Sequence, residues 1–401
     1  MSIKQGSVIG GILLISGSCI GAGMLALPVI TGVAGFIPAT FLFLLSWLFM
    51  TTTALLLLEA NLALGYHLSL ISIAEKTLGK PGKILAWILF VFLFYSLGIA
   101  YISASGEIVK GIVADFLNIS LPAWLGSALF TAIFGVVIYF GTKPVDYLNR
   151  LLMAGLILTY LLLVILGSAY LKPELLLHKN WKVSLLALPV LVISFGFHNM
   201  IPSLAEYLKG NVSKLRTTVF IGSLIPLVIY LVWEAVLLGI IPVEGRCGLL
   251  SALDLGQAAT TTLRNVVGKS WVCSVADAFA LFAIVTSFLA QSLSLVDFLS
   301  DGLKIPKIGG SRIFLILLTL VPPFIFACLY PGIFIQALNM AGGFSAVVLF
   351  GVMPALMVWV IRYKKRLNHP TVVPLGRPLL LLVLICGTGI FLLEFSKLLG
   401  F

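Results

Sequence analysis

The sequence has little charge. Asp, Glu, Lys and Arg make up only 10% of its 401 residues, four residues are histidines, and 61% are hydrophobic. Soluble domains have about 25% charged and about 45–50% apolar residues. A water-soluble fold of this size could not bury so much apolar surface, so lipid must surround most of the chain.

Acidic residues are the scarcer of the charged groups, with 14 Asp and Glu against 25 Lys and Arg, for a net charge of +11. In a soluble protein this excess would suggest nucleic acid as a partner. In a membrane protein it favours basic residues in cytoplasmic loops, so no nucleic-acid partner is predicted. The sequence also lacks HExxH and GxSxG motifs and any dense cluster of carboxylates or histidines, so an enzyme is not predicted.

Cysteines are few and scattered, without the paired spacing of a metal site or a disulfide framework. Four of the five fall in apolar runs, where they behave as small hydrophobic residues. We therefore predict no metal and no cofactor. The five positions are Cys19, Cys247, Cys273, Cys328 and Cys386.

Alternation of polar and apolar residues is absent as well, which excludes a membrane β-barrel and favours helices. The apolar runs are continuous and mostly as long as, or longer than, the ~20 residues that cross a bilayer. The sequence predicts an all-α integral membrane protein with eleven spans, a short interfacial helix within Gly65–Lys83 and a lid-like outer loop over Val243–Gly268. The predicted spans are 7–33, 35–62, 83–113, 122–141, 145–170, 184–207, 215–242, 269–299, 312–328, 332–361 and 377–399.

The orientation follows from the loops. Most of the 25 Lys and Arg residues fall in inner segments if the N-terminus is cytoplasmic. This asymmetry is the positive-inside pattern. With an odd number of spans, the C-terminus is then predicted to be periplasmic.

The first span is rich in helix-breaking residues. Gly17, Gly21 and Gly23 crowd its middle and Pro28 follows. Gly17 and Gly21 alone would also fit a GxxxG packing face between helices. The additional glycine and proline favour a break in the helix, and such breaks at bilayer depth occur only where they line a cavity or are buried in protein.

The sixth span contains a second break. Gly196 and Pro202 bracket the polar pair His198 and Asn199. Interrupted helices at matching positions of two halves indicate a transporter binding site. The free N–H groups of one half-helix suit a carboxylate and the free carbonyls of the other suit an ammonium group, so the predicted substrate is a zwitterion.

Motifs along nearly the whole chain resemble the hydroxy/aromatic amino acid permeases, in particular the branch that transports tyrosine and tryptophan. The motifs are IGAGMLALP at 20–28, LLLLEAN at 55–61, AYISASGE at 100–107, VDYLNR at 145–150, SFGFHNMIPSL at 194–204, GNVSKLR at 210–216, TSFLAQSLSLVDFLSD at 286–301, VPPFIFACLYP at 321–331 and GRPLLLLVLICG at 376–387. Cys19 stands where relatives commonly carry a hydroxyl, and Asn199 and Met200 where they carry small residues.

This resemblance implies one transmembrane domain over residues 1–401 with the five-plus-five inverted repeat of LeuT-type transporters. Repeat one would cover about 6–170, repeat two about 184–362, and an extra helix about 377–399. It also implies import of an aromatic amino acid, with tyrosine as the first choice, by proton symport across a bacterial inner membrane. A sodium-coupled neutral amino acid carrier and a tryptophan or phenylalanine transporter are the alternatives, and a channel is a more distant one.

The resemblance also assigns the binding residues. The backbone of the first break would hold the carboxylate and amine of the substrate, and the second break would form the other wall. Phe195 or Phe197 would stack on the aromatic ring, or would only pack in the protein; Tyr101 would donate to the carboxylate, or would bond to nearby backbone. The substrate-binding residues so predicted are Ser18, Cys19, Ile20, Gly21, Ala22, Gly23, Tyr101, Phe195, Gly196, Phe197, His198 and Asn199.

Four residues are candidates for ion coupling. His198 is the only histidine within a predicted span, and histidine changes its charge near neutral pH, so it is the first candidate for the proton. Glu59 is the second candidate, or else the partner of a cytoplasmic basic residue. Thr286 and Ser287 match a hydroxyl pair that sodium-coupled relatives use as cation ligands, which keeps sodium open as the coupling ion.

Overall fold

The computed structural model describes residues 6–118, 120–268, 270–367 and 369–399, and no strand occurs within these ranges. The first half contains α1 (Val8–Cys19), α2 (Gly23–Gly32), α3 (Phe36–Ala63), α4 (Leu70–Leu117), α5 (Ala123–Phe140), α6 (Thr142–Gly167) and the 3-10 turns η1 (Ser168–Tyr170) and η2 (Pro173–Leu177). Next come α7 (Trp181–Ser184), η3 (Leu185–Ala187), α8 (Leu188–Ser194), η4 (His198–Met200), α9 (Ile201–Tyr207), α10 (Val212–Ile240), α11 (Leu249–Asp254) and α12 (Ala259–Val267). The last elements are α13 (Ser270–Leu303), α14 (Gly309–Leu329), α15 (Phe334–Met340), the π-helical η5 (Ala341–Val352), α16 (Met353–Trp359), the π-helical η6 (Val360–Lys364) and α17 (Gly376–Leu398).

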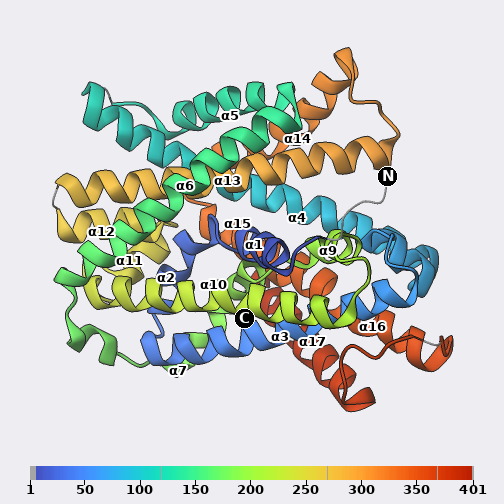
Figure 1. Ribbon diagram of the computed structural model, residues 1–401. Coiled ribbons are helices and arrows are strands. Elements are labelled where there is room, and N and C mark those ends of the chain that lie inside the picture. Colours follow the sequence, from blue (N-terminus) through green and yellow to red (C-terminus); the bar gives the residue numbers. More distant parts are fainter. Residues whose placement is uncertain (1–5, 119, 269, 368, 400–401) are drawn as a thin grey trace.

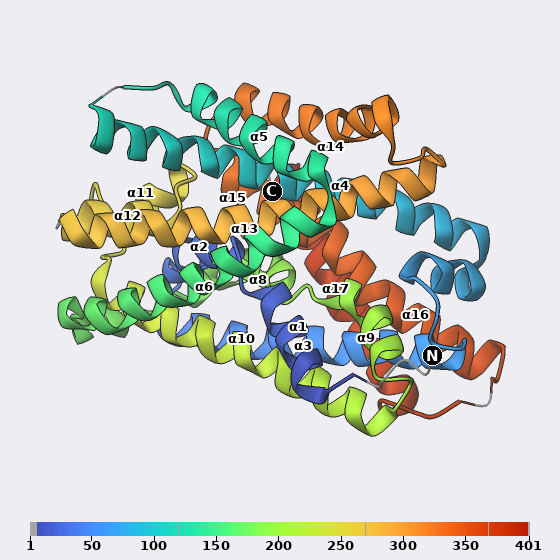
Figure 2. The same ribbon diagram turned by 45° about the horizontal axis from the view of Figure 1, so that its top comes forward.

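Most of the long helices run in a similar direction, while α6 and α17 cross them obliquely (Figures 1 and 2). The dark-blue α1 and α2 lie in the centre of Figure 1, between α10 and α13. Ten helical segments among the described residues are long and apolar enough to cross a membrane, and the bent pair α1–α2 makes an eleventh span. The eleven predicted spans are confirmed, with ends that differ by a few residues except in the third. The boundaries of the two repeats stay a prediction.

The first span is broken as predicted. α1 ends at Cys19, Ile20 is extended with φ −76° and ψ 105°, and α2 starts at Gly23 with its axis bent by 59° from that of α1. Pro28 does not end the span but lies inside α2. Proline has no N–H, so the carbonyl four residues before it loses its helical partner. That carbonyl, Met24 O, accepts a hydrogen bond from the Trp233 indole N–H of α10 at 3.0 Å.

The sixth span is broken over the predicted segment. α8 ends at Ser194, a turn through Gly196 follows, and η4 leads into α9. Pro202 lies in the first turn of α9, where a helix has no partner for the missing N–H and proline is tolerated. Each break has a helix on either side, and residues of both breaks line the same cavity.

The third span has an extra part at its inner end. Gly79 interrupts α4 with φ 75° and ψ −166°, a backbone conformation that favours glycine, and Pro81 follows it. The stretch from Leu70 to Gly79 is therefore a separate short helix, in agreement with the predicted interfacial helix. The predicted outer loop also contains two short helices. α11 packs on α2, and α12 packs on α2 and α13.

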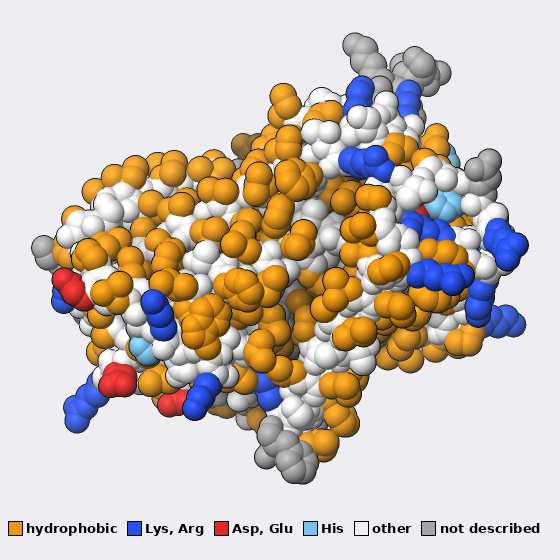
Figure 3. All heavy atoms as spheres, turned by 90° about the horizontal axis from the view of Figure 1, so that it is seen from below, with side chains coloured by type: hydrophobic (Ala, Val, Ile, Leu, Met, Phe, Trp, Pro, Cys, Tyr) orange, Lys and Arg blue, Asp and Glu red, His pale blue; other side chains and the backbone are white. Residues whose placement is uncertain are grey.

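The surface is that of a membrane protein. Hydrophobic side chains cover the middle of the face in Figure 3, while Lys and Arg gather at one end with few acidic side chains near them. Large apolar side chains that point outward include Ile133 and Phe140 on α5 and Ile385 on α17. We call the end that carries Arg362 and Lys364 of η6 the basic end, and the charge pattern of the sequence predicts that it faces the cytoplasm.

A buried ion pair closes this basic end. Glu59 of α3 is fully buried and accepts hydrogen bonds from Arg362 Nε at 2.6 Å and Arg362 Nη2 at 2.7 Å. Its Oε2 also accepts from the backbone N–H groups of Val372 and Val373, at 2.8 and 3.1 Å. The carboxylate thus ties the segment between η6 and α17 to α3. The sequence left Glu59 as either a proton site or the partner of a basic residue. The structure shows it paired with a basic residue, Arg362.

We expect Glu59→Gln to destabilise the protein, because Arg362 would then be largely buried without its counter-charge. Breaking a buried pair costs about 3–5 kcal/mol, whereas an exposed pair contributes about 0–1 kcal/mol. Thermal unfolding in detergent should therefore show a clearly lower Tm for Glu59→Gln than for Glu107→Gln, whose ion pair with Lys110 is exposed. Equal midpoints for the two variants would contradict this role.

Candidate functional site

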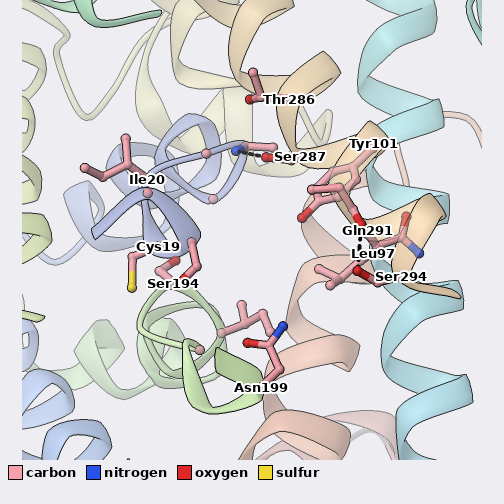
Figure 4. A pocket seen from close by; sticks show the side chains of 18 of the residues that line it. Cys19, Ile20, Leu97, Tyr101, Ser194, Asn199, Thr286, Ser287, Gln291 and Ser294 are labelled. Atoms are coloured by element: carbon pink, nitrogen blue, oxygen red, sulfur yellow. Dashed lines mark hydrogen bonds between the residues drawn. The ribbon is translucent and has the colours of Figure 1, made fainter. Parts of the chain in front are cut away.

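A cavity of about 210 Å³ lies between the two breaks (Figure 4). Its lining residues come from α1, α2, α4, α6, α8, η4, α13, α15 and η5. Typical pockets for drug-sized ligands have about 300–1,000 Å³, so this one suits a smaller molecule. Among the residues predicted from the sequence, those lining it are Ser18, Cys19, Ile20, Gly21, Ala22, Gly23, Tyr101, Gly196, Asn199, Thr286 and Ser287.

The glycines of the first break have different surroundings. A Cβ atom on Gly17 would meet nothing within 4 Å, so this residue faces the open cavity and not a helix. A Cβ on Gly21 would collide with Ser287 Oγ, and one on Gly23 would lie 2.9 Å from Ser194 Oγ. Close contacts with Ser287 and Ser194 therefore require glycine at positions 21 and 23. No such contact requires it at Gly17, where the missing side chain leaves room for a ligand.

The N-terminus of α2 is held by α13. The Ala22 backbone N–H donates to Ser287 Oγ at 3.0 Å (Figure 4). The N–H groups of Met24 and Leu25 donate to Gly21 O and Ala22 O. The N-terminal end of a helix favours negative charge. The backbone of Gly21–Gly23 at this end lines the cavity, where the helix end can favour a carboxylate.

The two C-terminal half-helix ends meet at one side chain of α10. The Tyr230 hydroxyl lies 2.6 Å from Cys19 O and 3.0 Å from Ser194 O, the last residues of α1 and α8. It is fully buried. A single hydroxyl is therefore shared between carbonyl groups at both breaks and holds the two helix ends close to each other.

The two phenylalanines predicted to stack on the substrate lie outside the cavity lining. Phe195 is fully buried and packs edge-on against Phe43 and Tyr230. Phe197 is also fully buried and lies beside the His198 ring at 5.4 Å. The structure thus places both on the packed side of the sixth span, and Gly196 and Asn199 form the cavity wall there.

His198 lies behind the wall as well. Its Nε2 is 2.9 Å from Thr53 Oγ1, and its ring stacks at 4.9 Å and 9° on Phe350, which lines the cavity. The Thr53 hydroxyl also lies 3.1 Å from Met50 O, so it can donate to that carbonyl and accept from His198 Nε2. Nδ1 has no partner among the described residues, so no neighbouring acceptor there favours a doubly protonated ring.

Tyr101 and Thr286 remain on the cavity wall. Tyr101 of α4 is 8% exposed, and its ring lies on the side of the cavity opposite Cys19 (Figure 4). The Thr286 hydroxyl donates to Phe282 O at 2.8 Å, so its hydrogen is used within α13. Glu59, by contrast, lies in the buried ion pair at the basic end and does not line the cavity.

Further polar residues line the cavity that the sequence reasoning missed. Gln291 follows Ser287 by one turn of α13, and its Nε2 donates to Phe94 O at 2.7 Å. Asn149 of α6 has a buried Oδ1 without a partner in the described part of the chain, so a ligand can use this acceptor. Helical spacing from Ser287 could have found Gln291, whereas nothing in the sequence places Asn149 beside α13. Within the described ranges, no group of three His, Cys, Asp or Glu could hold a metal.

A second cavity of about 330 Å³ connects the site with the basic end. It shares Phe90 and Asn199 with the central cavity, and its outer part is lined by the exposed pair His67 and Glu206. Phe90 and Asn199 therefore stand between the central cavity and the surface at the end predicted to be cytoplasmic.

Comparisons with known proteins agree with this architecture. The tyrosine-specific transport system 1 of Haemophilus influenzae is 34% identical over 97% of this chain and 96% of its own length. The tryptophan-specific transport protein of Pseudomonas aeruginosa is 31% identical over 96% and 94%, and the low affinity tryptophan permease of Escherichia coli is 30% identical over 98% and 96%.

A crystal structure of MhsT in complex with L-phenylalanine shares the fold, with a TM-score of 0.66 at 15% identity over 98% of this chain and 99% of that one. This confirms the LeuT-type arrangement with broken first and sixth spans. Residues 4–394 match the tryptophan/tyrosine permease family. The chain is therefore a member of the tryptophan/tyrosine permease family.

Proposed function

We propose that this protein imports an aromatic amino acid, tyrosine in the first place, by proton symport with alternating access. It would work in a bacterial inner membrane with a cytoplasmic N-terminus and a periplasmic C-terminus. The observation that carries the proposal is the cavity between the two breaks, which combines the N-terminus of one half-helix, the carbonyl end of another and an apolar wall. The names of the relatives support an aromatic substrate.

The lining suits a zwitterion with a ring. The backbone of Gly21–Gly23 would receive the carboxylate, and the carbonyl end of α1 would receive the ammonium group. Phe90, Phe94 and Phe350 line the remainder of the cavity and would contact the aromatic ring. Phe195 and Phe197 would support the wall from behind.

Alternating access would use the two ends of the cavity. Toward the basic end, Phe90 and Asn199 separate the site from the second cavity, so small movements of these side chains would open it to the cytoplasm. At the other end, α11 and α12 pack on α2 and would act as the outer cover. Movement of the half-helices at the two breaks would close the cavity on one side of the membrane and open it on the other.

Sodium coupling is the second candidate, because Thr286 and Ser287 place two hydroxyl oxygens in the cavity beside the first break. Such oxygens suit a hard cation. A substrate preference for tryptophan or phenylalanine is the other alternative, since a cavity lined by phenylalanines accepts each of the three rings.

The proposal predicts concentrative uptake of labelled tyrosine by proteoliposomes that contain the purified protein, when the outside is more acidic than the inside. Collapse of the pH gradient should abolish accumulation, and replacing Na⁺ by choline at fixed pH should not change it. The degree to which unlabelled tyrosine, tryptophan and phenylalanine inhibit the uptake of labelled tyrosine would rank the three as substrates. Uptake that follows Na⁺ and ignores the pH gradient would refute proton symport and favour the sodium-coupled alternative.

Gly17 provides a test of the cavity. We expect Gly17→Leu to raise the KM for tyrosine at least about tenfold, a loss of ~1.4 kcal/mol, because the new side chain would fill the open space. Gly389→Leu on α17 is the matched control, since a Cβ there also meets nothing within 4 Å but lies far from the cavity. Both variants should unfold at the wild-type temperature. Wild-type KM in Gly17→Leu would mean that the substrate binds elsewhere.

A further inference from the structure

Glu234 of α10 is a buried acid outside the cavity lining. It is 1% exposed, in a span where charged residues are rare, and it faces Thr31 of α2. Its Oε1 lies 2.8 Å from Thr31 Oγ1, and its Oε2 has no partner among the described residues. Intramembrane acids of this kind are expensive to bury and usually functional.

The Thr31 hydroxyl has two close oxygen neighbours. Its Oγ1 lies 2.7 Å from Leu27 O and 2.8 Å from Glu234 Oε1. A hydroxyl has one hydrogen and a carbonyl has none, so Thr31 cannot fully donate to both oxygens. When Thr31 donates to Leu27 O, a protonated Glu234 donates from Oε1 to Thr31 Oγ1, and each of the two short contacts then holds a hydrogen.

The surroundings of Glu234 are consistent with a neutral acid. The ion pairs formed among the described residues do not include it, and α2 has no charged residue. A carboxylate buried without a cation would be strongly disfavoured. The titratable groups on or beside the elements packed against α10 are Cys19 of α1, Glu59 of α3, Lys143, Asp146, Tyr147, Arg150 and Tyr160 of α6, Tyr170 of η1, Lys172, Glu174 and His178 at η2, and Arg264 of α12, which pairs with Asp277.

We propose that Glu234 binds the coupling proton, and that its hydrogen bond to Thr31 links proton occupancy to the position of α2. This deepens the proposed proton symport and rests on it. A proton from the outer side binds to the carboxylate, and the same proton leaves to the cytoplasm after the conformational change. Without the proton, the carboxylate must reach water, so the contact between α2 and α10 has to open.

The link to the substrate passes along α2. Gly23 at its start lines the cavity, whereas Thr31 lies two turns further on, next to Glu234. A shift of this half-helix therefore changes both sites at once. His198 is less suited in this conformation, because a second proton on Nδ1 would have no acceptor among the described residues.

Proteoliposomes with the wild type, Glu234→Gln and the control Glu394→Gln test the proposal. Glutamine keeps a donor for Thr31 but cannot release a proton. We expect Glu234→Gln to exchange labelled for unlabelled tyrosine without a gradient, but to reach only equal concentrations inside and outside under an imposed pH gradient. Proton entry on addition of tyrosine, followed with a trapped pH indicator, should be lost as well. Glu394→Gln changes a buried acid that pairs with Lys397 on α17 and should keep all three properties.

The outcomes are distinguishable. Gradient-driven accumulation by Glu234→Gln at the wild-type level would overturn the proposal, and so would loss of exchange, which would make Glu234 a structural residue only. A wild type that exchanges tyrosine but ignores the pH gradient would refute proton coupling and this proposal together. A wild type that carries no aromatic amino acid would refute the proposed function itself.

Discussion

The structure depends on satisfying the backbone groups that two broken helices release inside a membrane protein. In lipid, a free carbonyl costs several kcal/mol, so the breaks persist only where side chains replace the lost bonds. α10 supplies most of these side chains for the first break. Tyr230 binds the last carbonyl of α1, and Trp233 binds Met24 O, which Pro28 leaves without a donor.

The same contacts explain why the two breaks act as one unit. Because the Tyr230 hydroxyl also reaches Ser194 O, the ends of α1 and α8 share one donor, and neither can move far without releasing it. One turn further along α10, Glu234 contacts Thr31. α10 is therefore the helix that holds the half-helices in place, and in the proposed alternating access a change in any one of these contacts would alter the balance between conformations.

The sequence predicted what depends on local chemistry. The spans and both breaks were correct because apolar length, glycine and proline act where they stand. The pairing of Glu59 with Arg362 joins residues 303 positions apart, and sequence alone left it as one of two readings. The sequence could not predict whether Phe195 and Phe197 face the cavity or the packed protein. The non-helical turn at Gly196 interrupts the helix, so helical spacing no longer tells which way a side chain points. Tyr230, Trp233 and Glu234, at positions i, i+3 and i+4 in an apolar span, were a signal that could have revealed the support of the first break.

The cavity has no charged side chain among the described residues that line it. A neutral site of backbone dipoles can bind a zwitterion whose net charge is zero, and it releases it without breaking an ion pair. A coupling proton bound inside such a site would add a charge beside the ammonium group and weaken binding. In the proposed symport, a separate acid on α10 would avoid this conflict, because proton and substrate would then affect each other only through the position of α2. The distance between the two sites would let coupling and binding be optimised independently.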